Sequence, residues 1–171
     1  LDLNTKLKTN YNIDSRIENI IRNKVFCFKD PRFSYTLPIW KPFLENCVFI
    51  CIFRDPGSTI LSMQNRIKEL PKRKNGIGAI SLNKSNLYNI WNMMYTHILR
   101  KHRNEGKWLF IHYNQVFSNE GLLKLQDHTG AEVDPTFPDK NIRKHFSSDK
   151  INKNTLNIYN ELCNLADFKN I

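Results

Sequence analysis

The sequence contains no apolar run long enough to cross a bilayer, since polar residues interrupt every stretch well short of the roughly 20 residues that a spanning helix needs. Its first residues, Leu1-Asp2-Leu3-Asn4, lack the apolar core of a signal peptide. These two absences predict a cytoplasmic protein. The sequence also begins without methionine, and we expect it to start inside a longer protein.

Motifs for disulfides and metal ions are missing as well. The four cysteines form no Cys-x-x-Cys pair, and Cys27, Cys47 and Cys51 lie in or beside apolar runs. We therefore expect buried free thiols in a reducing compartment rather than disulfides or zinc ligands. His112 is expected to be a satisfied, partly buried residue. The histidines show no metal-ligand spacing, and none is assigned as a general base; they are His97, His102, His112, His128 and His145.

Acidic residues are outnumbered, with 16 Asp and Glu against 26 Lys and Arg and a formal net charge of +10. This excess favours an anionic partner such as nucleic acid, a membrane surface, a phosphate-bearing cofactor or an acidic glycan. Simple solvation of the surface is an equal alternative, because Lys and Asn recur throughout the chain. The aromatic residues lie mainly in apolar runs and do not alternate with the basic ones, which argues against a nucleic-acid stacking surface.

What is present is enough for one domain. The chain has 171 residues, of which 40% are hydrophobic and 12% aromatic, and no internal repeat. Apolar runs separated by helical patterns predict an α/β fold with a mostly parallel sheet. The run over 47–53 is continuously apolar and suggests a central strand covered on both faces. Strands are expected over 25–28, 47–53 and 108–113, and irregular segments over 1–12, over 71–85 as a mobile basic loop, and over 131–150. The first expected helix is short, with Asp14 as N-cap and Ile17, Ile20 and Ile21 on one face. Further helices are expected from Pro56, over 86–103, from Ser118 to a stop at Gly130, and at the end of the chain, where Leu156, Tyr159, Leu162 and Leu165 mark the last one.

The strongest local pattern is the strand and helix start from Val48 to Ser62. A buried strand carries Arg54 to the edge of the sheet where open α/β folds bind ligands. The helix that follows offers free N–H groups and a positive end to an anion, and Ser62 can add a hydroxyl. The alternative is an Arg54–Asp55 pair that closes the turn while Ser62 faces solvent.

Four segments in this order resemble sulfotransferases that use 3′-phosphoadenosine 5′-phosphosulfate, in particular their bacterial-type branch. Arg54 with Ser62 is similar to the family's 3′-phosphate motif, and the resemblance extends over about residues 24–166. The other segments are Lys29-Asp30-Pro31-Arg32-Phe33-Ser34 followed by Leu37-Pro38, the helix from Trp91 to Leu99, and His112-Tyr113-Asn114-Gln115-Val116-Phe117, in which Asn114 and Gln115 replace the family's acidic residues. The resemblance implies a three-layer α/β fold in which helices flank a mostly parallel sheet, as in P-loop nucleotide-binding proteins.

The resemblance also implies roles for single residues. Arg54 and Ser62 would hold the 3′-phosphate of the cofactor, and Tyr113 would lie against its adenosine. Arg143, with Lys144, could reach back to the phosphate, although surface solvation explains these two residues better.

On the acceptor side, Lys29 would neutralise charge near the transferring sulfuryl group. Asp30 or Arg32 would contact an acceptor hydroxyl or amine, and Asp30 is also the candidate base. The alternative for this segment is a strand end closed by an Asp30–Arg32 pair. The acceptor itself, whether sugar, lipid, peptide or small molecule, is not indicated by the sequence.

One family element has no counterpart. Sulfotransferases bind the 5′-phosphosulfate with a Ser-Gly-Thr loop that precedes these segments, and this sequence has no glycine before Gly57. We therefore expect the chain to supply only the 3′-phosphate and adenosine side of the site and to be inactive by itself. Other hypotheses are a basic, non-catalytic binding module for nucleic acid or anionic glycan, a degenerate family member, and a nucleotide kinase, which the missing Gly-x-x-x-x-Gly-Lys-Ser/Thr motif disfavours.

Overall fold

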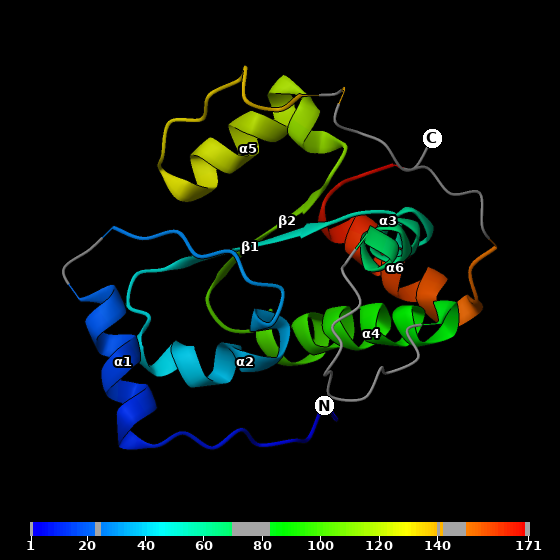
Figure 1. The fold of residues 1–171 in the computed structure, drawn as a ribbon. Coiled ribbons are helices and arrows are strands. Elements are labelled where there is room, and N and C mark those ends of the chain that lie inside the picture. The colour runs from blue at the N-terminus through cyan, green and yellow to red at the C-terminus, as the bar shows by residue number, and fades with distance from the viewer. Residues whose placement is uncertain (1, 23–24, 70–82, 140, 142–149, 170–171) are drawn as a thin grey trace. The chain divides into compact units, whose positions relative to one another are not determined.

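The computed structural model describes residues 2–22, 25–69, 83–139, 141 and 150–169 of the chain (Figure 1). The chain forms two compact units, one made of Leu1–Cys47 with Met93–Lys107 and one of Val48–Asn92 with Trp108–Ile171. The described residues form six α-helices and a two-stranded parallel sheet. The expected α/β class is thereby confirmed, while the three-layer arrangement stays a prediction.

The first unit begins with helix α1, Tyr11–Ile21. Its N-cap is Asn10, whose side chain accepts the N–H of Ile13 at 3.1 Å. The expected cap, Asp14, instead lies in the first turn of the helix, where its charge complements the helix dipole. The helix therefore starts inside the segment that we expected to be irregular. Of its apolar residues only Ile17 is buried.

The strand expected over 25–28 is absent: residues 25–30 form neither helix nor strand. Val25 is fully exposed, and the rings of Phe26 and Phe28 stack on each other with centroids 5.0 Å apart. Phe28 also lies 5.9 Å from the ring of Trp40. Aromatic contacts thus replace the sheet pairing that the apolar run suggested. The thiol of Cys27 is consequently exposed, contrary to expectation.

The other regular elements described in the first unit are helical. Helix α2 spans Phe33–Trp40 with Pro38 inside it, and the 3-10 turn η1, Lys41–Phe43, follows directly. The last turn of helix α4, Lys84–His97, continues into the π-helical turn η2, Ile98–His102. Gly106, with φ of 85°, lies between this turn and the next strand.

In the second unit, strand β1 spans Val48–Phe53 and strand β2 spans Lys107–His112, close to the expected positions. Burial alternates along the C-terminal half of β1, where Cys51 and Phe53 are buried while Ile50 and Ile52 are 37% and 53% exposed. The expectation that β1 is covered on both faces is therefore wrong. A continuous apolar run does not by itself tell how many faces of a strand are packed.

Helices α3, Pro56–Glu69, and α5, Asn119–Thr129, also lie where expected. Ser118 caps α5 by accepting the N–H of Gly121, and Gly130 ends it in the left-handed conformation. Residues 131–139 form no helix or strand, as expected. The core of both units consists mainly of Ile17, Leu37, Cys51, Phe53, Ile60, Leu87, Trp91, Leu99, Phe110, Ile111, Ile158, Tyr159, Leu162 and Cys163.

The final helix, α6, spans Lys153–Leu165 and is capped by Asn152. Tyr159 and Leu162 are buried as expected, but Leu156 and Leu165 are 41% and 39% exposed. The buried stripe instead continues through Thr155, Ile158 and Cys163.

The expected basic loop over 71–85 lies outside the described residues as far as position 82. Asn83 caps α4 by accepting the N–H of Asn86 at 2.9 Å, so residues 84 and 85 are helical. Across the described ranges, no helix is both long and apolar enough to cross a membrane. The same ranges hold no cluster of three or more potential metal ligands.

Candidate functional site

The two strands end side by side in the second unit. The N–H of Tyr113, just after β2, donates to the carbonyl oxygen of Phe53, the last residue of β1, at 2.7 Å. This bond extends the strand pairing by one residue. It brings together the residues that follow the two strands, Arg54 after β1 and Tyr113 after β2. The guanidinium carbon of Arg54 accordingly lies 5.2 Å from the centre of the Tyr113 ring. Arg54 and Tyr113, both expected from the sequence to hold a nucleotide, are thus in cation–π contact.

Asp55 caps helix α3. Its Oδ1 accepts the N–H of Ser58 at 2.7 Å, and its carbonyl oxygen accepts the N–H of Thr59 at 3.0 Å. Pro56, the first helical residue, has no N–H to offer. The expectation that the N–H groups of this helix start bind an anion therefore needs correction, because a carboxylate of the chain already occupies part of that position. An Asp-Pro pair is the sequence pattern of an N-cap followed by the first helical residue, and it could have revealed this role.

Ser62 lies one turn after Ser58 on the same side of α3. Ser58 is buried, whereas Ser62 is partly exposed. Its contact with a phosphate stays a prediction.

His112, the residue before Tyr113, is buried, and only 2% of it is exposed. Its Nδ1 accepts the backbone N–H of Asn114 at 3.1 Å, and its Nε2 lies 3.2 Å from the hydroxyl oxygen of Tyr159. A backbone N–H can only donate, so Nδ1 carries no proton and the neutral ring holds its proton on Nε2. Nε2–H therefore donates to Tyr159. The ring of Phe168 stacks on the imidazole, with centroids 3.8 Å apart and planes 8° apart.

Tyr159 and Cys163 continue this network along α6. Burial is the main cause that raises the pKa of the Tyr159 hydroxyl, and the hydrogen bond to Cys163 and the charge of Asp55 raise it further. Burial likewise raises the pKa of the Cys163 thiol, with Asp55 adding to the effect. Both groups are therefore protonated near neutral pH. The sequence predicted Tyr159 to be a core residue of the last helix. Because a buried tyrosine hydroxyl usually has a hydrogen-bond partner, the sequence could also have predicted a polar contact at this residue.

Gln115 joins the same turn to the end of α6. Its Oε1 accepts the N–H of His112 at 2.7 Å, and its Nε2 donates to the carbonyl oxygen of Ala166 at 2.8 Å. A carboxylate at this position could accept the first bond but could not donate the second. The amide that departs from the sulfotransferase pattern thus has a structural role.

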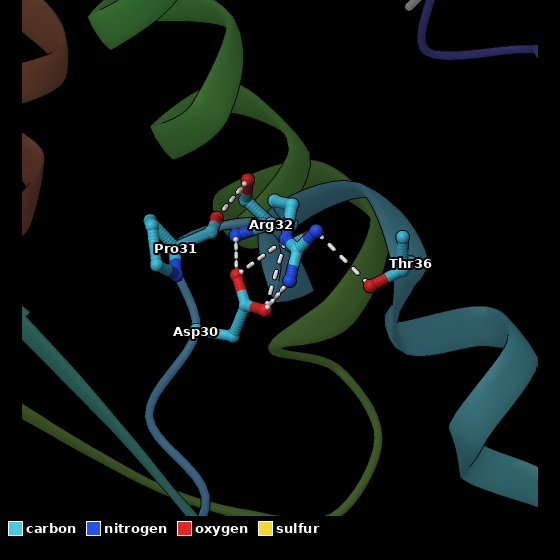
Figure 2. Close-up of polar contacts among 5 residues, drawn as sticks. Asp30, Pro31, Arg32 and Thr36 are labelled. Atoms are coloured by element: carbon cyan, nitrogen blue, oxygen red, sulfur yellow. Dashed lines mark hydrogen bonds and ion pairs between the residues drawn. The ribbon is translucent and has the colours of Figure 1, made fainter. Parts of the chain in front are cut away.

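The Lys29–Arg32 segment belongs to the first unit, where Asp30 and Arg32 pair with each other (Figure 2). The carboxylate of Asp30 accepts the backbone N–H of Arg32 at 2.8 Å and the Nε–H at 2.9 Å. The Nη2 group donates to the same carboxylate. The Arg32 carbonyl oxygen in turn accepts the hydroxyl of Thr36, in the first turn of α2, at 3.1 Å. The sequence alternative of an Asp30–Arg32 pair is therefore what the structure contains, at a helix start instead of a strand end.

This pairing changes the acidity of Asp30. The side-chain hydrogen bond from Arg32 is the largest cause that lowers the pKa of Asp30 to about 2. A carboxylate with so low a pKa is a weak proton acceptor near neutral pH. Lys29, the preceding residue, is exposed.

The structure therefore brings together Arg54 with Tyr113 in one unit and Asp30 with Arg32 in the other. Arg143 lies outside the described residues. Comparison with protein-family models, with curated proteins and with solved structures finds no match for this chain.

Proposed function

We propose that this chain binds the adenosine and 3′-phosphate of 3′-phosphoadenosine 5′-phosphosulfate and so serves sulfuryl transfer to a hydroxyl or amine acceptor. The observation that supports the proposal best is the contact between Arg54 and Tyr113 at the ends of two paired parallel strands. This is the edge at which open α/β sheets bind ligands. A guanidinium beside an aromatic ring can serve one nucleotide, the guanidinium binding a phosphate and the ring packing against the base or ribose.

In this proposal the residues divide the work. Arg54 and Ser62 hold the 3′-phosphate, and Tyr113 packs against the adenosine. The bound nucleotide supplies an activated sulfuryl group. Lys29 neutralises charge that develops on that group, and Arg32 contacts the acceptor; these two roles rest on the sequence resemblance.

The low pKa of Asp30 bears on its proposed role. Because its carboxylate is a weak proton acceptor, the proposal gives Asp30 the orientation of Arg32 and leaves the general base to another group.

Titration calorimetry with adenosine 3′,5′-bisphosphate tests the nucleotide site. Arg54→Ala should weaken binding of the bisphosphate about 10- to 100-fold, because a charge-assisted hydrogen bond contributes roughly 1.5–3 kcal/mol. Its effect on adenosine 5′-phosphate, which lacks the 3′-phosphate, should be small. The matched control is Arg66→Ala, which removes the same charge from an exposed position on α3.

Three results would contradict the proposal: no binding of the bisphosphate, equal losses in the two arginine variants, or equal losses for the two nucleotides in Arg54→Ala. Salt-sensitive binding to generic DNA that the bisphosphate does not reduce would favour the basic binding module instead.

A further inference from the structure

The turn that contains Tyr113 makes a hydrogen bond to a buried side chain, that of His112. Tyr113 follows the last residue of β2, and its ring contacts Arg54 on one side and the ring of Phe117 on another, with centroids 5.1 Å apart for the two rings. The direction of this ring depends on the backbone of residues 113 and 114. That backbone is fixed by the N–H of Tyr113, which donates to Phe53, and by the N–H of Asn114, which donates to His112.

We infer that His112 is a positioning residue of the nucleotide site, which holds the Tyr113–Asn114 turn through its unprotonated Nδ1 and is itself held by Tyr159. This inference rests on the proposed function, because it assigns a role toward the same nucleotide. According to this inference, Tyr159 of helix α6 also affects nucleotide affinity, through its bond to His112.

The hydrogen bonds in this network point in one direction. The N–H of Asn114 donates to Nδ1 of His112, and Nε2–H donates to the hydroxyl oxygen of Tyr159. Burial raises the pKa of the Tyr159 hydroxyl, which is therefore protonated near neutral pH and accepts Nε2–H through its oxygen. The N–H of Asn114 fixes the tautomer, because it can only donate and so requires an unprotonated Nδ1. The bond to Tyr159 then links this side of the imidazole to α6.

Packing fixes the plane of the imidazole as well. Phe168 stacks flat on one face at 3.8 Å, and Phe53 meets the ring at 77° with centroids 5.2 Å apart. With the ring plane set and the ring 2% exposed, Nδ1 has one direction in which to accept a bond, toward Asn114. A side chain that only filled the core would need neither nitrogen.

Two substitutions separate positioning from packing. In His112→Asn the side-chain oxygen lies two bonds from Cβ, as Nδ1 does, and can accept the N–H of Asn114. In His112→Gln the amide lies three bonds from Cβ, as Nε2 does, so it can reach Tyr159 but not Asn114. Asn is the smaller residue and leaves the larger cavity, so packing alone would make His112→Asn the more damaging change.

The experiment measures two quantities in the full chain. Calorimetry with adenosine 3′,5′-bisphosphate should give an affinity within about threefold of the original for His112→Asn and at least tenfold weaker for His112→Gln. Hydrogen exchange at the amide of Asn114, measured without nucleotide, should stay slow in His112→Asn and become at least tenfold faster in His112→Gln. Tyr159→Phe, which keeps Nδ1 but removes the acceptor of Nε2–H, should lie between them in both measurements.

The inference is overturned if the order of the two histidine variants is reversed or if they are equal in Asn114 exchange. It is equally overturned if exchange follows the expected order while both bind the bisphosphate alike. If the original chain does not bind the bisphosphate at all, the proposed function fails, and with it the assignment of His112 to a nucleotide site. The exchange measurement then reports only whether His112 holds the turn.

Discussion

The Oδ1 of Asp55 accepts the N–H of Ser58 at 2.7 Å, so a carboxylate caps helix α3 next to the arginine that we assign to a phosphate. The cap lies at the point where the chain leaves β1 and enters the helix, one residue after Arg54.

Loss of this cap should destabilise the protein. Asp55→Ala should lower the free energy of unfolding by about 1 kcal/mol, the usual cost of removing an N-cap, whereas Asp55→Asn should cost only a few tenths, since asparagine caps nearly as well. Urea unfolding measures both. Asp127→Ala, at an exposed position of α5, is the control, and equal losses at positions 55 and 127 would show that Asp55 is not an effective cap.

Gly121 is expected to resist substitution because of space. A Cβ at this position would lie 2.0 Å from the backbone oxygen of Gln115, next to the turn that carries Tyr113. Gly121→Ala should therefore cost about 1–3 kcal/mol in urea unfolding, as overpacking does.

Gly130→Ala is the comparison, since a Cβ there meets nothing within 4 Å and only the φ of 68° opposes it. It should cost about 1 kcal/mol from backbone strain. Of the two glycine variants, only Gly121→Ala should also alter bisphosphate binding. A Gly121→Ala variant as stable as the original would contradict the close packing on Gln115.

His102 should make the first unit sensitive to acid. It is 3% exposed, and its Nε2–H donates to the carbonyl oxygen of Ser34 at 3.0 Å. Burial is the main cause that lowers the pKa of His102 below 6.5, and the charges of Lys41 and His97 lower it further, while the bond to Ser34 and the charge of Glu105 oppose them.

The sign follows from proton linkage. The folded state binds a proton at His102 less readily than the unfolded state, so its contribution to stability is present above about pH 6.5 and is lost as the pH falls through the folded pKa. Urea unfolding between about pH 7.5 and 5 should show this loss. His102→Gln, which can still donate to Ser34 but cannot titrate, should flatten the dependence. An unaltered pH dependence in His102→Gln would refute the assignment.

Three of the four thiols should differ strongly in how fast they react. Cys27 is exposed, whereas Cys51 and Cys163 are buried, and burial raises the pKa of Cys51 to about 12. At about pH 8, iodoacetamide should modify Cys27 first and should reach Cys51 and Cys163 only after unfolding, because the thiolate is the reacting form. Peptide mass spectrometry of the time course checks the order. Labelling of Cys51 as fast as that of Cys27 would contradict its burial in β1.

The sequence by itself determined the elements whose signals are local. The run over 47–53 marked β1, Ser118 and Gly130 marked the two ends of α5, and Pro56 marked the start of α3, because caps, turns and periodicity act within a few residues. It also singled out Arg54 and Tyr113 one by one.

Only the tertiary structure decided features that depend on distant partners. Residues 25–28 pair with no strand among the described residues, and the ring of Phe28 lies against those of Phe26 and Trp40 instead. Ile50 and Ile52 remain exposed although their run is apolar throughout. The contact of Arg54 with Tyr113 depends on the pairing of two strands that are separated by two helices along the chain. The bonds of His112 to a turn and to α6 depend on the same assembly. Such contacts form only when the elements pack together, so the spacing of residues in a single sequence does not predict them.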